Sequence, residues 1–175
     1  IKHDSSFPIN SIKEILRINK LNLSDIDHIV FYEKPFVKFE RLMDTYVSFA
    51  PRGIRSYLKS MPLWISEKLF QKKNMINQLN SIEKMNNIEK KIKFSEHHLS
   101  HAASAFYPSP FKEALILTID GVGEKVTTSV AIGKGSDIKI TKEIHFPHSL
   151  GLLYSSFTHF LGFKVNDGEY KVMGL

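Results

Sequence analysis

Three histidines stand close together in the segment His97-His98-Leu99-Ser100-His101. His97 and His101 are four residues apart, so on a helix their side chains would project from the same face, as two ligands of one ion must. Neutral imidazole suits Fe, Zn or Mn. The alternative is a set of structural histidines that are hydrogen-bonded to the backbone. The spacing alone does not choose between the two interpretations.

Zinc proteases are one class of enzyme with this histidine spacing, but the residue after the first histidine does not fit a zinc protease. The metalloprotease motif places a glutamate, the general base, directly after the first histidine. Here that position is His98. The chain has no cysteine, which excludes disulfides and thiolate ligands. Any metal must therefore be held by nitrogen and oxygen ligands.

Two further segments have residue types suited to phosphate or metal binding. Asp120-Gly121-Val122-Gly123-Glu124 follows a strongly apolar run, and its glycines permit a tight turn whose N–H groups can face a phosphate. Asp120 also offers an oxygen ligand, whereas a plain hairpin turn is the alternative. Residues 166–171 hold two acids and a lysine around a glycine. Lys171 can pair with a phosphate or with Glu169, and a solvated loop is the alternative.

The second half of the chain has the pattern of a strand meander flanked by helices. A helix is predicted over residues 96–107, where Pro108 and Pro110 end it. It carries the histidine pair and follows a short predicted strand at 92–94. Another helix is predicted over 150–161. Three β-branched runs separated by glycines predict an antiparallel meander over residues 114–120, 126–132 and 138–146.

The first half is predicted to be mainly helical. Ser11, with a glutamate three residues later, forms a capping-box pattern that predicts the start of a helix. Residues 26–32 predict a buried strand. Over residues 37–80 apolar positions recur at mixed spacings of three and four, which predicts several helices, broken or kinked at Pro51 and Pro62.

Length and composition indicate an ordinary globular protein. With 175 residues, 42% of them hydrophobic and 24% charged, the chain can bury one sizeable core. It has no apolar run long enough for a membrane span and no signal-peptide start, so we expect a cytoplasmic protein without a membrane partner. It lacks an initiator Met and a polar C-terminal tail, so we expect it to be part of a longer protein.

The net charge of +6 favours anionic partners. A basic nucleic-acid-binding module is therefore one hypothesis, supported by the lysine-rich residues 68–93. Aromatic residues are not interleaved with these lysines as stacking platforms require, so we expect no nucleic-acid partner. Three basic residues follow the first predicted strand: Lys34, Lys38 and Arg41. They indicate either an anion site or an exposed helix face.

Three stretches resemble the carbamoyltransferase family that includes nodulation-factor and antibiotic O-carbamoyltransferases. They are Lys2-His3-Asp4 with Phe7-Pro8, the run HHLSHAASAFYPSPF with the following LILTIDGVGE, and the final GEYKVMGL. The order and spacing agree across essentially the whole chain. The chain is identified as a member on this resemblance, and it covers only part of a family member.

The resemblance implies an α/β fold of the actin, hexokinase and Hsp70 type, also called ribonuclease H-like, with two lobes. Residues 1–111 would be the remainder of the first lobe, with a helical insertion and the helix of the histidine pair. Residues 112–175 would begin the second lobe with the strand meander and a helix. The domain is expected to be truncated at both ends.

The resemblance also implies an ATP-dependent O-carbamoyltransferase. A C-terminal domain would make carbamoyl-adenylate from ATP and carbamoyl phosphate, and this domain would pass the carbamoyl group to a hydroxyl of a small-molecule acceptor. Enzymes of tRNA threonylcarbamoyl transfer and other actin-fold ATP-dependent enzymes are the alternative, but the continuation AASAFYPSPF favours a small-molecule acceptor. We expect the isolated chain to be inactive.

The same resemblance assigns the site residues. A divalent metal, iron or else zinc or manganese, would be held by His97, His101 and Asp120, with a further Asp ligand beyond Leu175. His98 would act as the base for the acceptor hydroxyl. The contacts to the adenylate phosphate would come from Gly121, Gly123, Glu124 and Lys171.

Overall fold

The computed structural model describes residue 4, residues 6–65 and residues 70–175. The chain divides into two compact units, each with one small sheet. Unit 1 comprises Ile1–Phe31 and Met43–Phe94, and unit 2 comprises Tyr32–Leu42 and Ser95–Leu175. The protein is therefore a mixed α/β protein. Among the described residues, the helices are too short or too polar to cross a membrane.

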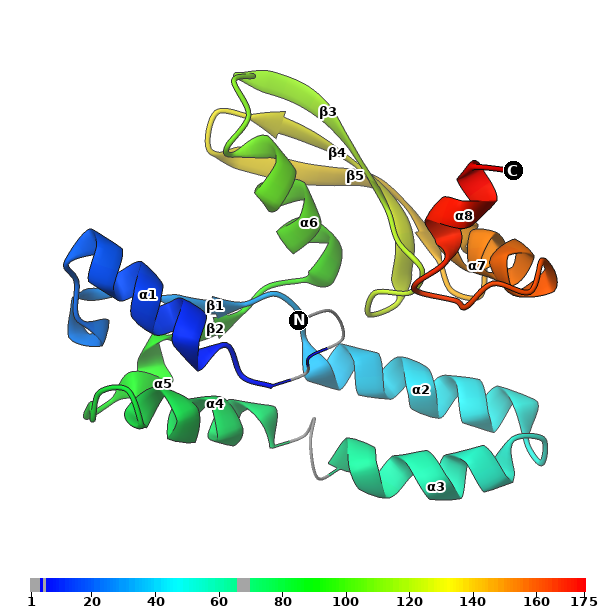
Figure 1. Ribbon diagram of the computed structural model, residues 1–175, viewed down its shortest axis with the longest axis horizontal. Helices are drawn as coiled ribbons and strands as arrows, with labels where there is room; N and C mark the ends of the chain where they lie inside the picture. The colour runs from blue at the N-terminus through cyan, green and yellow to red at the C-terminus, as the bar shows by residue number, and fades with distance from the viewer. Residues whose placement is uncertain (1–3, 5, 66–69) are drawn as a thin grey trace. The chain divides into compact units, whose positions relative to one another are not determined.

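Unit 1 has a two-stranded parallel sheet in which β1 (Ile29–Phe31) pairs with β2 (Ile92–Phe94). Both strands were predicted, although β1 is shorter than the predicted run and is not buried as predicted, since Val30 is 61% exposed. Around this sheet lie α1 (Ile9–Asn19), η1 (Leu23–Asp25), α4 (Gln71–Asn80) and α5 (Ile88–Lys91), drawn in Figure 1. Their apolar faces pack into a core whose buried residues are Leu23, Met75, Leu79, Ile88 and Ile92.

The predicted capping box at Ser11 is wrong. Helix α1 begins at Ile9 after an N-cap at Pro8, and no side chain caps it. The proline ring restricts φ, here −79°, to a value close to that of a helix. The Pro8 carbonyl accepts the N–H of Ile12 at 3.0 Å, so the helix starts one turn earlier than the polar pattern predicted.

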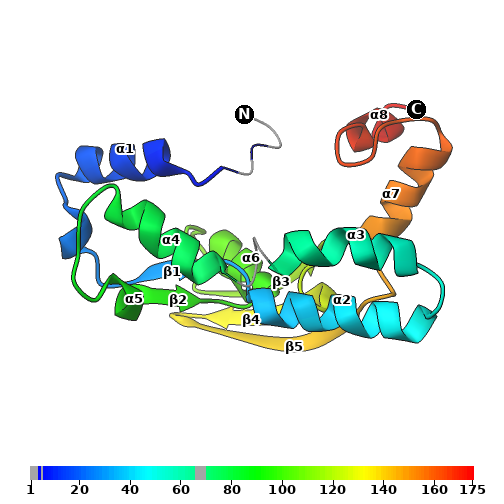
Figure 2. The same ribbon diagram turned by 90° about the horizontal axis from the view of Figure 1, so that it is seen from below.

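Helix α2 (Pro35–Phe49) is joined to α3 (Ile54–Trp64) by a short turn that contains Pro51 (Figure 2). The predicted break at Pro51 is confirmed, whereas Pro62 lies inside α3 and does not break it. Pro62 lies in the last turn of the helix, where the missing N–H costs one hydrogen bond and few residues remain to be displaced.

Unit 2 contains the predicted antiparallel meander, in the order β3-β4-β5. Its strands are β3 (Glu113–Ile119), β4 (Val126–Lys134) and β5 (Asp137–His145). Helix α6 (His97–Phe106) packs against this sheet (Figure 1), and Ala102 and Phe106 contact Ile116 and Ala131 in a second core. A Cβ at Gly133 would lie 2.8 Å from the Phe106 ring, so this glycine permits the close approach of α6.

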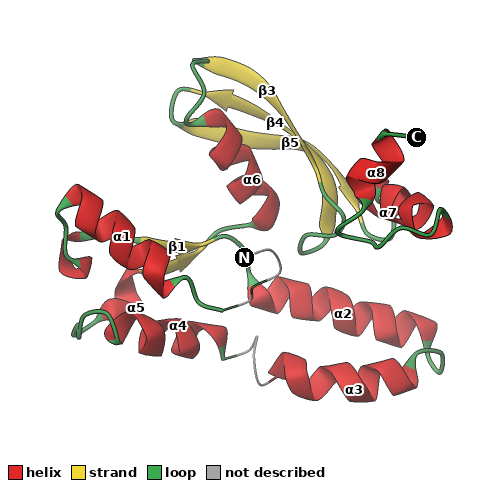
Figure 3. Cartoon of the chain, viewed as in Figure 1, coloured by secondary structure: helices red, strands yellow, loops and turns green. Residues whose placement is uncertain are grey.

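Two helices follow the meander, α7 (Leu150–Phe160) and α8 (Glu169–Met173), both drawn in Figure 3. The predicted helix over 150–161 is confirmed, and the alternative of a loop over 166–171 is replaced in part by α8. Ser149 caps α7 by accepting the N–H of Leu152 at 3.0 Å, and its hydroxyl lies 2.6 Å from the Gly121 carbonyl. The start of α7 is thereby joined to the turn that follows β3.

Candidate metal centre

Three ligand-type atoms converge where α6 begins and β3 ends. His97 Nε2 lies 2.7 Å from Asp120 Oδ2 and 3.1 Å from His101 Nε2. His101 Nε2 lies 3.8 Å from the same Asp120 oxygen. The histidines are one helical turn apart, so their rings share a face of α6. The packing of α6 on the meander brings Asp120, the residue after β3, to that face.

The donor set suits a divalent transition metal. Ligand atoms bound to one ion at about 2.0–2.2 Å lie roughly 3 Å apart, and the three separations here range from 2.7 to 3.8 Å. Two imidazole nitrogens and a carboxylate oxygen are ligands that Zn, Fe and Mn accept. Three protein ligands also leave a coordination position open, as in catalytic zinc sites.

The Asp120 carboxylate is held in its ionised form. The hydrogen bond from His97 lowers the pKa of Asp120 to about 2, and the N–H of Gly121 adds to this effect. The Gly121 N–H donates to Oδ1 at 2.6 Å, which leaves Oδ2 facing the two histidines. The site thus presents a carboxylate that is already charged at neutral pH.

Gly123 gives the His97 ring the space it occupies. A Cβ at this position would lie 2.7 Å from His97 Cδ2 and 3.2 Å from His98 Cδ2. The Gly123 N–H donates to the Val126 carbonyl at 3.2 Å, and the Gly121 N–H donates to Asp120. Both glycine donors are thus used inside the turn. The phosphate contacts assigned to Gly121 and Gly123 stay a prediction. They require each N–H to give up its hydrogen bond within the turn and to donate to a phosphate oxygen instead.

The other two residues assigned to phosphate lie in different surroundings. Glu124 is buried, and its carboxylate accepts the backbone N–H of Lys34. Lys171 is an exposed residue of α8, with Nζ 5.9 Å from the ring centres of Phe163 and Tyr170. The structure therefore brings Glu124 close to the histidine helix, whereas the contacts described for Lys171 lie within its own segment. Their roles toward an adenylate stay predictions.

His98 lies on the inner side of α6, away from the face of the metal-type ligands. It is 3% exposed, and Nδ1 lies 3.0 Å from the Ser129 hydroxyl of β4. Burial lowers the pKa of His98, and the neighbouring His97 adds to this effect, while the Asp120 charge and the Val126 carbonyl oppose it. The ring is therefore neutral at neutral pH. Its role as the catalytic base stays a prediction.

A cavity of about 240 Å³ in unit 2 has both His97 and His98 in its wall. Polar pairs lie around it, with Lys34 Nζ 2.8 Å from a Glu96 oxygen and His145 Nε2 2.9 Å from a Glu143 oxygen. The mixed polar and apolar wall suits a small polar molecule. The cavity therefore offers space beside the candidate metal centre.

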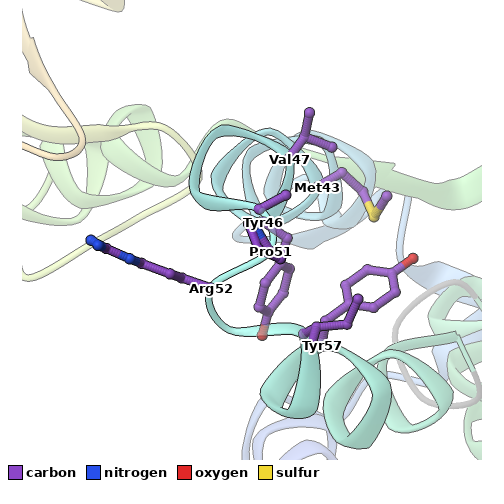
Figure 4. A pocket seen from close by; sticks show the side chains of 8 residues that line it. Met43, Tyr46, Val47, Pro51, Arg52 and Tyr57 are labelled. Carbon is purple, nitrogen blue, oxygen red and sulfur yellow. The ribbon is translucent and has the colours of Figure 1, made fainter.

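Unit 1 has a second cavity, of about 180 Å³, at the turn between α2 and α3 (Figure 4). The Tyr46 and Tyr57 rings meet edge to face there with centres 5.1 Å apart, and the Arg52 side chain points away. The wall holds no histidine or carboxylate and so offers no metal ligand. It consists of Met43, Tyr46, Val47, Ala50, Pro51, Arg52, Ile54 and Tyr57.

Glu33, a carboxylate beside the site, was not among the residues predicted from the sequence. It lies in the short connection between β1 and α2 and is 2% exposed. Its position directly after the predicted strand over residues 26–32, like that of Asp120 after β3, was the available signal. The basic residues that follow it, Lys34 and Lys38, dominate the charge pattern of this stretch.

Fold and site define a mixed α/β protein that gathers a histidine pair and an aspartate at one end of a strand meander. Residues 1–175 match the family described as Carbamoyltransferase N-terminus. The chain therefore belongs to the family of carbamoyltransferase N-terminal domains, which confirms the resemblance found in the sequence.

Relatives of this chain include nodulation proteins. It is 53% identical over 175 residues to an uncharacterized protein of Synechocystis sp., covering 99% of this chain and 28% of that protein. It is 37% identical over 175 residues to the nodulation protein NolNO of Sinorhizobium fredii, covering 100% of this chain and 24% of the relative. Over 81 residues it is 43% identical to the nodulation protein NolO of Bradyrhizobium diazoefficiens, which covers 45% of this chain and 14% of the relative. The chain thus spans about a quarter of the first two relatives.

Proposed function

We propose that this chain is the metal-binding part of an ATP-dependent O-carbamoyltransferase. The observation that carries the proposal is the convergence of His97, His101 and Asp120 in a chain of the carbamoyltransferase family. The reaction takes a carbamoyl group from carbamoyl-adenylate, formed from ATP and carbamoyl phosphate, to a hydroxyl of a small-molecule acceptor. We assign formation of the adenylate to a C-terminal domain of the same polypeptide, and the much greater length of the relatives supports this assignment.

The proposal includes an actin, hexokinase and Hsp70-like fold for the complete domain. Residues 112–175 would open the second lobe, with residues 1–111 as the remainder of the first. Support comes from the β3-β4-β5 meander, followed directly by α7. Further support comes from the turn after β3, which carries Asp120 and is joined to the start of α7 through Ser149.

His97, His101 and Asp120 would hold the metal. A divalent ion bound there supplies Lewis acidity that polarises the carbamoyl carbonyl. The ionised Asp120 offsets part of the positive charge of the ion. The rigid packing of α6 on the sheet keeps the two imidazoles at fixed positions, which reduces the cost of ordering ligands when the ion binds.

Carbamoyl transfer forms a bond between the acceptor oxygen and the carbamoyl carbon, and breaks the bond from that carbon to the phosphate oxygen of the adenylate. AMP leaves with the electron pair, and the hydroxyl proton passes to a base. His98 is the base we propose. Its ring is neutral and in the cavity wall, and its buried Nε2 makes no hydrogen bond to the described residues. An acceptor hydroxyl would have to enter that cavity.

The test is metal content and carbamoyl transfer in the intact protein, purified without chelator. Wild type is compared with His97→Ala and His101→Ala, and His28→Ala, an exposed histidine of unit 1, serves as the control. We expect both site variants to lose the metal and the transfer of carbamoyl from ATP and carbamoyl phosphate, while the control keeps both. Metal and activity that survive in the site variants would show that the histidine pair is structural.

A further inference from the structure

Glu33 is a buried carboxylate that needs compensation. It is 2% exposed in the connection between β1 and α2. Burying a charge costs several kcal/mol unless a partner and hydrogen bonds offset that cost. Lys38 supplies one partner, with Nζ 2.9 Å from Glu33 Oε2. This ion pair keeps a negative charge at a fixed place inside unit 2.

The same carboxylate oxygen faces His97. Glu33 Oε2 lies 4.0 Å from His97 Nδ1, and Nδ1 is buried without a hydrogen-bond partner among the described residues. The other ring nitrogen, Nε2, faces Asp120 and His101. One imidazole therefore lies between two carboxylates, with its metal-type nitrogen on one side and Glu33 on the other.

We infer that Glu33 is a positioning residue for the metal ligand His97. An imidazole that binds an ion through Nε2 carries its hydrogen on Nδ1, and a carboxylate on the Nδ1 side stabilises that form, which leaves Nε2 available to the ion. At 4.0 Å the pair is too far apart for a direct hydrogen bond. Glu33 acts through its charge, which Lys38 offsets in part and which salt screens little at a buried position. The inference rests on the proposed metal site.

Neighbouring groups restrict the ring to this orientation. The Tyr32 and His97 ring centres lie 5.9 Å apart, and the Gly123 backbone leaves no room for an added Cβ beside the ring. Because steric contacts already limit movement of His97, a change of charge at Glu33 acts mainly on the affinity of Nε2 for an ion. Its effect is thus separable from packing.

The experiment measures Zn²⁺ affinity of the intact protein by chelator competition, with thermal unfolding as the check on folding. Glu33→Gln removes the charge at nearly constant shape. The double variant Glu33→Gln with Lys38→Met removes both members of the ion pair, so it folds without an orphaned ammonium. We expect both to bind Zn²⁺ about 10–100-fold more weakly. Glu33→Asp, which keeps the charge, should recover part of the loss.

A matched control is Glu96→Gln, which neutralises the acid directly before His97. Glu96 has a 53% exposed side chain and pairs with Lys34 at 2.8 Å, so its charge is screened by water and we expect wild-type affinity. A spectroscopic readout comes from ¹⁵N-labelled histidine in the Zn²⁺-loaded protein. The His97 Nδ1–H proton should move upfield in Glu33→Gln and stay in place in Glu96→Gln.

The inference is overturned if the folded double variant binds Zn²⁺ within about twofold of wild type, or if the Nδ1–H resonance does not respond to Glu33→Gln. Either result leaves the carbamoyltransferase proposal standing, because wild type still binds the metal. If the His97→Ala variant binds Zn²⁺ as tightly as wild type does, both proposals are overturned. The two failures are thus distinguishable.

Discussion

Gly123 is the position at which one added methyl group most directly perturbs the candidate metal centre. In Gly123→Ala the new Cβ would lie 2.7 Å from His97 Cδ2, 3.1 Å from the Val126 carbonyl oxygen and 3.2 Å from His98 Cδ2. Real Cβ contacts are longer, so the His97 ring or the backbone has to move. Forcing an extra methyl group into a packed site costs about 1–3 kcal/mol.

Gly121→Ala is a matched control in the same turn. A Cβ at Gly121 has no neighbouring atom within 4 Å, and neither glycine has the positive φ that would strain an alanine. Reduced freedom of the unfolded chain should make this variant neutral, or more stable by about 0.4–1 kcal/mol. The pair thus separates contact with His97 from the general effect of replacing a glycine.

The assay is urea unfolding of the intact protein, together with Zn²⁺ titration. We expect Gly123→Ala to lower the free energy of unfolding by about 1–3 kcal/mol and to weaken Zn²⁺ binding, because His97 loses its position relative to His101 and Asp120. Equal stability and Zn²⁺ affinity in the two alanine variants would refute the reasoning.

Three further predictions follow from the same region of unit 2. In metal-free protein, Asp120 has a pKa of about 2 against 3.8 for the free side chain, so its ionised form stabilises the fold above pH 4 and this contribution is lost as the pH falls toward 2. Between pH 6 and 2.5 we expect the free energy of unfolding, measured with urea, to fall by about 1–2 kcal/mol less in Asp120→Asn than in wild type. Gly151→Ala should destabilise the protein by at least about 2 kcal/mol in the same assay, because its Cβ would meet the Asp120 carbonyl oxygen at 2.5 Å and backbone cannot easily yield. Thr127→Val should cost about 1–3 kcal/mol, because the fully buried hydroxyl lies 3.1 and 2.6 Å from the carbonyls of Ile144 and His148.

Each of these three has a clear contrary result. An unchanged pH dependence in Asp120→Asn would show that its hydrogen bond with His97 does not stabilise the folded state. A Gly151→Ala variant as stable as wild type would show that α7 does not lie against the Asp120 backbone. Wild-type stability of Thr127→Val would show that the two carbonyls do not depend on its hydroxyl.

The local elements of the fold follow from short patterns of residues along the chain. The strand meander follows from its β-branched runs separated by glycines, and helix α6 from the prolines that end it; both were predicted within two residues of the observed bounds. The His97 and His101 spacing determined that the two rings share a helix face. These features depend on neighbours a few positions apart, so the linear pattern contains them. The same kind of pattern failed at Ser11, where the neighbouring Pro8 determined the start of α1.

Which distant residues meet at those elements depends on the tertiary structure. It brought Asp120 to His97 across 23 positions, turned His98 toward Ser129 on β4, and buried Glu33 beside the far nitrogen of His97. Such contacts depend on how α6 packs on the meander and where the connection after β1 passes. That packing is set by the summed burial of many apolar side chains, and no short stretch of sequence specifies it.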